Sequence, residues 1–134
     1  MKKSIYYFLN FTWGIIMNLI GFLAASVLIA TKHKVNTYNG CLHFVVGKKR
    51  GGVSLGIVII TDNTPSEHVL KHEYGHTIQN AMYGIFFPFI VGIPSMLRYW
   101  KREILKSKGV VLEPYDSVWY EGEATAFGNK YLGG

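Results

Sequence analysis

The feature that most restricts what this chain can fold into is a long uncharged stretch from Ile5 to Ala30. At about 26 residues, it is longer than the roughly 20 that a helix needs to cross a bilayer. Lys32 and Lys34 follow it and end the apolar segment. A cleaved signal peptide is the alternative, but its apolar core spans only about 7–15 residues. The sequence therefore predicts a transmembrane anchor helix within residues 1–34.

A second apolar stretch, residues 81–97, is interrupted by two glycines and two prolines. Basic residues lie on both of its flanks, and basic flanks favour the cytoplasmic side of a membrane. A segment whose two ends stay on one side must turn back. We therefore expect a re-entrant or interfacial helical hairpin, bent at Pro88 and Pro94. A single kinked transmembrane helix is the alternative.

The overall composition indicates a membrane protein rather than a protein that binds nucleic acid. The net charge is +6, 15% of the residues are aromatic and the mean hydropathy is +0.18. In an apolar chain, an excess of positive charge is typical of segments that flank a membrane, and no nucleic-acid-binding motif is present. The single cysteine, Cys41, excludes an intramolecular disulfide and is expected to be a small buried apolar residue.

An H-E-x-x-H pattern occurs in a segment that is predicted to be helical, as His72-Glu73-Tyr74-Gly75-His76. The preceding Thr64–Glu67 has the capping threonine, first-turn proline and capping-box glutamate of a helix start. Side chains four residues apart share one helix face, so His72 and His76 can bind one metal ion. Glu73 flanks them and is predicted to be the general base that takes a proton from a water activated by zinc.

A catalytic zinc needs a third protein ligand, and the best candidates lie in a predicted helix over residues 118–127. Glu121 and Glu123 point to different sides of that helix, so only one of them can bind the same metal ion as the two histidines. Ala124 shares the face of Glu121, and its small side chain lets this helix approach the histidine-bearing helix closely. Helix geometry alone leaves both glutamates open.

The two motifs together resemble those of the gluzincin zinc metallopeptidases, in which H-E-x-x-H is followed by E-x-x-A-[D/N] on a second helix. Residues 120–127 look most like that helix in the integral-membrane CAAX prenyl endopeptidase and HtpX-like group. The resemblance is specific only in the two motifs, and it implies that Glu121 is the zinc ligand. Thr125 stands where the family has the Asp or Asn that braces a zinc-bound histidine. Threonine accepts a hydrogen bond more weakly, and Asp116 is the alternative brace.

A β-hairpin is predicted between the anchor and the H-E-x-x-H helix. Its strands are Cys41–Val46 and Val53–Ile60, with a basic turn over Lys48–Gly52. The candidate edge for pairing with an extended peptide substrate contains Val53, Ser54, Leu55 and Gly56. A hairpin that only covers the helix is the alternative. The expected fold is mainly α with a small β-hairpin, an α+β class with a zincin-like core.

Other polar residues are weaker candidates for a role in the site. His43 lies in a predicted strand and His68 near the start of the H-E-x-x-H helix, so neither is expected to bind the metal. Zinc peptidases commonly use a side-chain donor to stabilise the developing oxyanion. Three tyrosines are candidates for that role, and the sequence does not choose between Tyr83, Tyr115 and Tyr120.

These features together predict a membrane-anchored, zinc-dependent metallopeptidase, in which residues 35–134 form one small domain. The expected partners are a peptide or membrane-protein substrate and the lipid bilayer, with the active site on the cytoplasmic side. Lipid or a second copy of the chain can complete the small core. A zinc-binding membrane sensor, an immunity protein or a partner-binding module, descended from a peptidase but without turnover, is the alternative.

Overall fold

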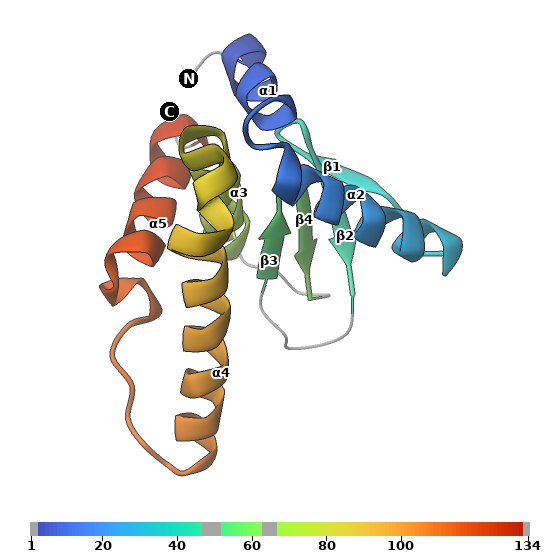
Figure 1. Ribbon diagram of the computed structural model, residues 1–134. Coiled ribbons are helices and arrows are strands. Elements are labelled where there is room, and N and C mark those ends of the chain that lie inside the picture. Colours follow the sequence, from blue (N-terminus) through green and yellow to red (C-terminus); the bar gives the residue numbers. More distant parts are fainter. Residues whose placement is uncertain (1–2, 47–51, 63–66, 133–134) are drawn as a thin grey trace.

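A small four-stranded sheet lies among five helices in the computed structural model, which describes residues 3–46, 52–62 and 67–132 (Figure 1). The fold is mainly helical with a small sheet, so the α+β class is confirmed. The helices are α1 Lys3–Phe11, α2 Ile15–Ala30, α3 Glu67–Tyr83, α4 Ile93–Ser107 and α5 Trp119–Leu132. The strands are β1 Asn36–Tyr38, β2 Cys41–Val45, β3 Gly52–Leu55 and β4 Val58–Thr61. Short helical turns occur at η1 Gly84–Phe86, η2 Pro88–Gly92 and η3 Tyr115–Ser117.

The sheet has the strand order β1-β2-β4-β3, which differs from the predicted single hairpin. Two hairpins, β1–β2 and β3–β4, are antiparallel, and they join through a parallel pairing of β2 with β4. The prediction that residues 41–46 and 53–60 are two strands of one hairpin is therefore wrong. The turn predicted over Lys48–Gly52 falls mostly on residues 47–51, which lie outside the described residues.

Two tight turns explain the pairing that the structure adopts. Asn39 and Gly40 both have positive φ, +46° and +85°, as a two-residue type I′ hairpin turn requires. Gly56, with φ +64°, begins the second tight turn and divides the predicted strand 53–60 into β3 and β4. Each hairpin is thus closed by a local turn, while the parallel contact between β2 and β4 depends on the packed helices.

Helices cover both faces of the sheet, which explains why its central strands read as continuous apolar runs. Phe44 on β2 and Val58 on β4 pack against Ala25 of α2 on one face. On the other face, Cys41 and Ile59 belong to a core that α1 and α3 complete through Tyr6, Tyr74, Ile78 and Ala81. The helix that carries the H-E-x-x-H motif therefore lies directly against the sheet.

The predicted anchor is not one continuous helix, because the chain bends by 86° between α1 and α2. Asn18 fills the break: its side-chain nitrogen donates to Asn10 O at 2.8 Å and to Gly14 O at 3.1 Å. Asn80 of α3 also donates to Asn10 Oδ1 at 2.7 Å and Gly14 O at 3.1 Å. These three asparagines are fully buried, and they tie the bend to α3.

A second bend, of 116°, lies between the helical segments Glu67–Phe86 and Pro88–Ser107, which contain α3 and α4. Gly84 begins it with φ +56°, a conformation that favours glycine, and the Trp13 ring packs on the space where a Cβ would lie. The bend therefore falls close to Pro88, as predicted. Pro94 lies in the first turn of α4, where proline fits a straight helix, so the second predicted bend is wrong. The predicted helix start at residues 64–66 lies outside the described residues.

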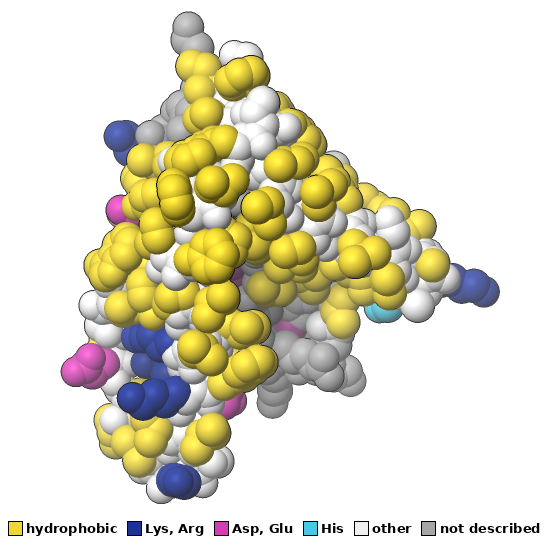
Figure 2. Space-filling view, viewed as in Figure 1, with side chains coloured by type: hydrophobic (Ala, Val, Ile, Leu, Met, Phe, Trp, Pro, Cys, Tyr) yellow, Lys and Arg dark blue, Asp and Glu magenta, His cyan; other side chains and the backbone are white. Residues whose placement is uncertain are grey.

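One face of the molecule presents many exposed apolar side chains, over α1, α2 and α4 (Figure 2). Leu23 and Phe89, for example, are each 69% exposed, and α4 has no buried residue at all. Within the described residues, no single helix is long and apolar enough to cross a membrane. The two bent pairs, residues 3–30 and 67–107, meet that test when each pair is taken together.

Helices α3 and α5 pack tightly along their lengths because small residues line their contact. A Cβ on Gly75 would lie 1.7 Å from Ala124 O, and one on Gly128 would lie 1.9 Å from Lys71 O. Ala124 is itself fully buried. The prediction that Ala124 allows the second helix to approach the first is confirmed, and Gly75 of the H-E-x-x-H motif is the residue that receives it.

Candidate metal centre

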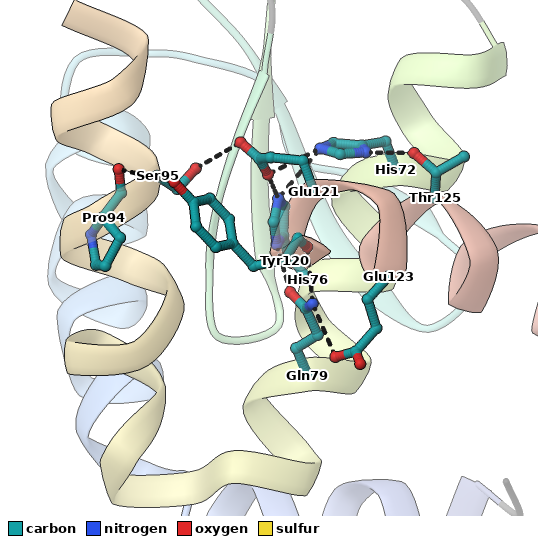
Figure 3. A network of polar contacts seen from close by, with 9 residues as sticks. All are labelled: His72, His76, Gln79, Pro94, Ser95, Tyr120, Glu121, Glu123 and Thr125. Atoms are coloured by element: carbon teal, nitrogen blue, oxygen red, sulfur yellow. Dashed lines mark hydrogen bonds and ion pairs between the residues drawn. The ribbon is translucent and has the colours of Figure 1, made fainter. Parts of the chain in front are cut away.

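Three side chains that can bind a metal ion converge between α3 and α5. They are His72 and His76, one turn apart on α3, and Glu121 in the first turn of α5, and all three are buried. The two Nε2 atoms lie 3.1 Å apart, and Glu121 Oε1 lies 3.4 Å from His72 Nε2 and 2.8 Å from His76 Nε2 (Figure 3). This group can hold a metal ion.

A hydrogen bond to Gln79 fixes the tautomer of His76. His76 Nδ1 lies 2.7 Å from Gln79 Oε1. The nitrogen of the same amide faces two acceptors, Tyr120 O at 2.9 Å and Glu123 Oε1 at 3.1 Å, which assigns the amide orientation. An amide oxygen only accepts, so His76 Nδ1 carries a proton and Nε2 of the neutral ring presents a lone pair to the cluster.

The second imidazole is braced by a hydroxyl. His72 Nδ1 lies 2.8 Å from Thr125 Oγ1, so Thr125 contacts the histidine at the position where the resembled family has an acid or amide. The backbone of Asp116 lies in η3, but its side chain is outside what the structure describes. Thr125 is therefore the brace that the structure places on His72.

The carboxylate of Glu121 is held from both sides. Ser95 donates a hydrogen bond to its Oε2 at 2.9 Å, while its Oε1 faces the two histidines and has no hydrogen-bond partner. Burial alone would raise the pKa of Glu121, but the adjacent imidazoles of His72 and His76 outweigh burial and hold that pKa well below its usual range. The group is therefore an anion ready to bind a cation.

Glu123, the alternative third ligand, is not part of the metal group, by which we mean His72, His76 and Glu121. Its Oε1 accepts hydrogen bonds from Gln79 Nε2 and from the Tyr83 hydroxyl. Figure 3 shows Glu123 beyond Gln79, on the side of α5 away from the two imidazoles. Of the two glutamates that the sequence left open, the structure brings only Glu121 to the histidines.

Glu73 lies beside the cluster, on the wall of a cavity of about 800 Å³. Its side chain is only 5% exposed and packs against Gly52 of β3, where a Cβ would lie 2.9 Å from Glu73 Oε2. His76 and Tyr115 line the same cavity, and most of the remaining wall consists of apolar side chains from α2, the sheet, the segment around η2 and α4. An acid and one histidine of the group that can hold a metal ion therefore face one mainly apolar chamber.

The predicted substrate strand borders this chamber. β3 is the end strand of the sheet, with β4 as its partner on one side, and Val53, Ser54 and Leu55 line the cavity. Gly56 belongs instead to the turn after β3 and packs against Asn18, so the structure does not bring it to the cavity. Three of the four predicted substrate-binding residues thus lie near Glu73.

Among the three candidate tyrosines, the structure brings Tyr115 to the centre. Its ring contacts that of His72, with centroids 5.9 Å apart, and burial followed by the charge of Glu121 raises the pKa of its hydroxyl. The Tyr83 hydroxyl donates to Glu123 and the Tyr120 hydroxyl to Pro94 O. Neither His43, which is bound to Thr61 at 2.8 Å, nor His68 belongs to the metal group.

Sequence reasoning missed two residues that hold this centre together, Gln79 and Ser95. Gln79 follows His76 by three positions, so helix periodicity places it on a neighbouring part of the same face, and this signal could have revealed it. Ser95 lies on α4, beyond a bend whose direction no local pattern specifies.

Comparisons with known proteins give this chain no relative: no protein-family model, curated protein or solved structure matches it.

Proposed function

We propose that this chain is a membrane-bound, zinc-dependent peptidase of gluzincin type, in which His72, His76 and Glu121 bind zinc. One observation carries the proposal: three buried metal-binding atoms converge beside the acid Glu73 at the wall of an apolar cavity. Two imidazoles and one carboxylate are a donor set that catalytic zinc sites use, with a fourth position left open.

The geometry of the three atoms supports a tetrahedral ion. Ligands about 2.0–2.1 Å from one tetrahedral zinc lie about 3.3 Å from one another. The three separations here are 2.8, 3.1 and 3.4 Å. A proton between His76 and Glu121 would satisfy only that pair. A cation bound at the centre would satisfy all three acceptors, including the otherwise unpaired Glu121 Oε1.

In this proposal, each step of peptide hydrolysis is assigned to a particular residue. Zinc would supply the Lewis acid that polarises the scissile carbonyl and acidifies water. Glu73 takes a proton from the attacking water as the new C–O bond forms, and returns it to the amine nitrogen as the C–N bond breaks. The hydroxyl of Tyr115, on the cavity wall beside His72, is the donor best placed to stabilise the developing oxyanion.

The substrate that fits this chamber is an extended, apolar peptide segment. Within the described residues, β3 has a partner strand on one side only. A peptide that pairs with its other edge would run past Glu73, because Gly52 at the start of that strand contacts the Glu73 side chain. Ile20, Ile93 and Met96 line the cavity and are also among the exposed apolar side chains. The chamber is thus continuous with the apolar face, from which a membrane-protein segment can enter.

The apolar face also supports attachment to a bilayer. It combines α1, α2, η2 and the start of α4, while basic side chains lie at the α2 end and along the rest of α4 (Figure 2). That arrangement suits apolar residues in the lipid with lysines and arginines at the cytoplasmic head groups. The two bent helix pairs would enter the bilayer without a simple crossing. If so, the protein stays with the membrane through an alkaline carbonate wash, and release into the supernatant would reject this part of the proposal.

The decisive experiment measures zinc content and peptide hydrolysis on the same detergent-purified protein. We expect about one zinc per chain in the wild type and in Glu73→Gln, and none in His76→Ala. Against a quenched peptide library, Glu73→Gln should lower hydrolysis by about 10²–10⁴-fold. Glu103→Gln, which alters an exposed carboxylate on α4, is the matched control and should change neither quantity.

The possible outcomes separate the two functional hypotheses. Zinc bound by folded protein that hydrolyses no peptide, in detergent or in lipid, would reject the peptidase and favour the metal-binding protein without turnover. Folded wild type without zinc would reject both.

A further inference from the structure

His76 has two links to acidic residues: its Nε2 faces Glu121, and its Nδ1 leads through Gln79 to Glu123. The second link is a chain of oriented hydrogen bonds. The Tyr83 hydroxyl and the Gln79 amide nitrogen both donate to Glu123 Oε1, and Gln79 Oε1 accepts from His76 Nδ1. Gln79 is fully buried, so its amide has no solvent to replace these partners.

We propose that Gln79 and Glu123 form a positioning pair that selects the metal-binding tautomer of His76. Histidines that bind metals commonly donate their second N–H directly to a carboxylate or a carbonyl group. Here the Gln79 amide lies between His76 and the carboxylate of Glu123. The orientation of that amide determines which ring nitrogen of His76 carries the proton. This inference rests on the metal site of the proposed function, but it does not depend on peptide hydrolysis.

The direction of each hydrogen bond carries the argument. Glu123 and Tyr120 O are acceptors, so they hold the nitrogen end of the Gln79 amide and turn its oxygen toward His76. That oxygen can accept only from a protonated Nδ1, which leaves Nε2 free for the metal ion. An amide turned by 180° would instead favour the opposite tautomer of His76, whose Nε2 proton would block metal binding.

The test measures metal affinity of the full chain in detergent, by chelator competition for Zn²⁺ and by the absorption spectrum of bound Co²⁺. Gln79→Leu removes all three hydrogen bonds of the amide at similar size, and we expect an affinity about 10–100-fold weaker with an altered Co²⁺ spectrum. Glu123→Gln should give a smaller loss of the same kind. Glu103→Gln, on the exposed face of α4, should match the wild type.

A double variant separates positioning from packing. In Gln79→Glu combined with Glu123→Gln, the carboxylate at position 79 still accepts from His76 Nδ1 and now also accepts from the amide at position 123. The tautomer of His76 is thus preserved, while Tyr120 O loses its donor. We expect the double variant to bind metal more tightly than Gln79→Leu and to restore the wild-type Co²⁺ spectrum. Thermal unfolding of the metal-free proteins checks that each variant is folded.

The inference fails if folded Gln79→Leu binds metal like the wild type. It also fails if the double variant recovers neither affinity nor spectrum, since Gln79 then serves only to fill space. In both cases the wild type still binds metal, and the proposed function stands. Wild-type protein that binds neither Zn²⁺ nor Co²⁺ would overturn the proposed function together with this inference.

Discussion

Helix α3 carries two buried polar clusters that differ in how their hydrogen bonds are matched. The metal group lies at His72 and His76, and an amide cluster lies near the end of the helix, where Asn80 meets Asn10 and Asn18. Both clusters join α3 to another helix, and both are shielded from solvent. Burial alone therefore does not distinguish a binding site from a structural element.

In the amide cluster, donors meet acceptors. Asn18 donates to Asn10 O and accepts from the Ile57 backbone N–H at 2.8 Å, and Asn80 donates to Asn10 Oδ1. A single acceptor, Asn80 Oδ1, is left without a partner. Such a cluster stabilises the bend between α1 and α2 without any added group, because its members already satisfy one another.

In the metal group, acceptors meet acceptors. The tautomer that Gln79 imposes on His76 directs a lone pair at the carboxylate of Glu121, and His72 Nε2 faces the same point. Without a cation, only a proton on an imidazole can join these acceptors, which agrees with the lowered pKa of Glu121, and one proton serves only one pair at a time. The comparison teaches that the direction of hydrogen bonds, rather than the presence of polar residues, marks a place for a ligand.

The largest effect that this contrast predicts is in Glu121→Ala. Removal of one of three ligands should weaken zinc binding by at least about 1000-fold, or about 4 kcal/mol. The metal-free protein should remain folded, because the variant also removes a buried charge beside two imidazoles. Zinc content and thermal unfolding in detergent measure the two expectations, with Glu113→Ala, an exposed glutamate, as the control. Retained zinc would show that the cluster is not the metal site.

The second-largest loss of zinc affinity is expected from Gly75→Ala, which would displace the backbone of α5 and, with it, Glu121. The new Cβ would lie 1.7 Å from Ala124 O, so α5 and Glu121 must move away from α3. We expect a loss of about 1–3 kcal/mol in stability and a clear drop in zinc affinity. Gly92→Ala is the matched control, since its Cβ would meet no atom closer than 3.7 Å. Normal zinc affinity in Gly75→Ala would mean that the ligands do not depend on this helix contact.

A substitution in the amide cluster should lower stability without changing zinc binding. Asn18→Ala leaves the Ile57 N–H without its acceptor and Asn10 O without a donor, which costs about 1–3 kcal/mol of stability. Zinc content per folded chain should not change. Denaturation in detergent and metal analysis test both points, and Asn129→Ala, an exposed asparagine on α5, serves as control. Loss of zinc from folded Asn18→Ala would break the distinction between the clusters.

The two clusters also differ in how far the sequence reveals them. His72 and His76 are one helical turn apart, so their shared face follows from local geometry, and a glutamate with a small neighbour identifies the second helix. The amide cluster joins positions 10, 18 and 80, whose meeting depends on a bend inside an apparently uniform apolar run. Hydropathy counts charges and apolar residues, and it does not register where a buried asparagine ends a helix.

The sheet shows the same limit. Asn39-Gly40 is a strong local signal for a two-residue hairpin turn, and it would have predicted the pairing of β1 with β2. The parallel contact of β2 with β4 has no such local signal, because the strands meet only after the intervening chain has folded. The edge position of β3 beside Glu73 therefore emerges from tertiary packing, even though its residues were predicted.

The smallest predicted effect concerns Thr125, the brace of the second imidazole. Its hydroxyl lies 2.8 Å from His72 Nδ1, and Thr125→Val removes that contact with little change in shape. We expect about 10-fold weaker zinc binding with stability nearly unchanged. Thr125→Ser keeps the hydroxyl and should bind zinc as the wild type does. Equal losses in both variants would assign the effect to the lost methyl packing. The Thr125 hydroxyl would then have no part in orienting His72 for metal binding.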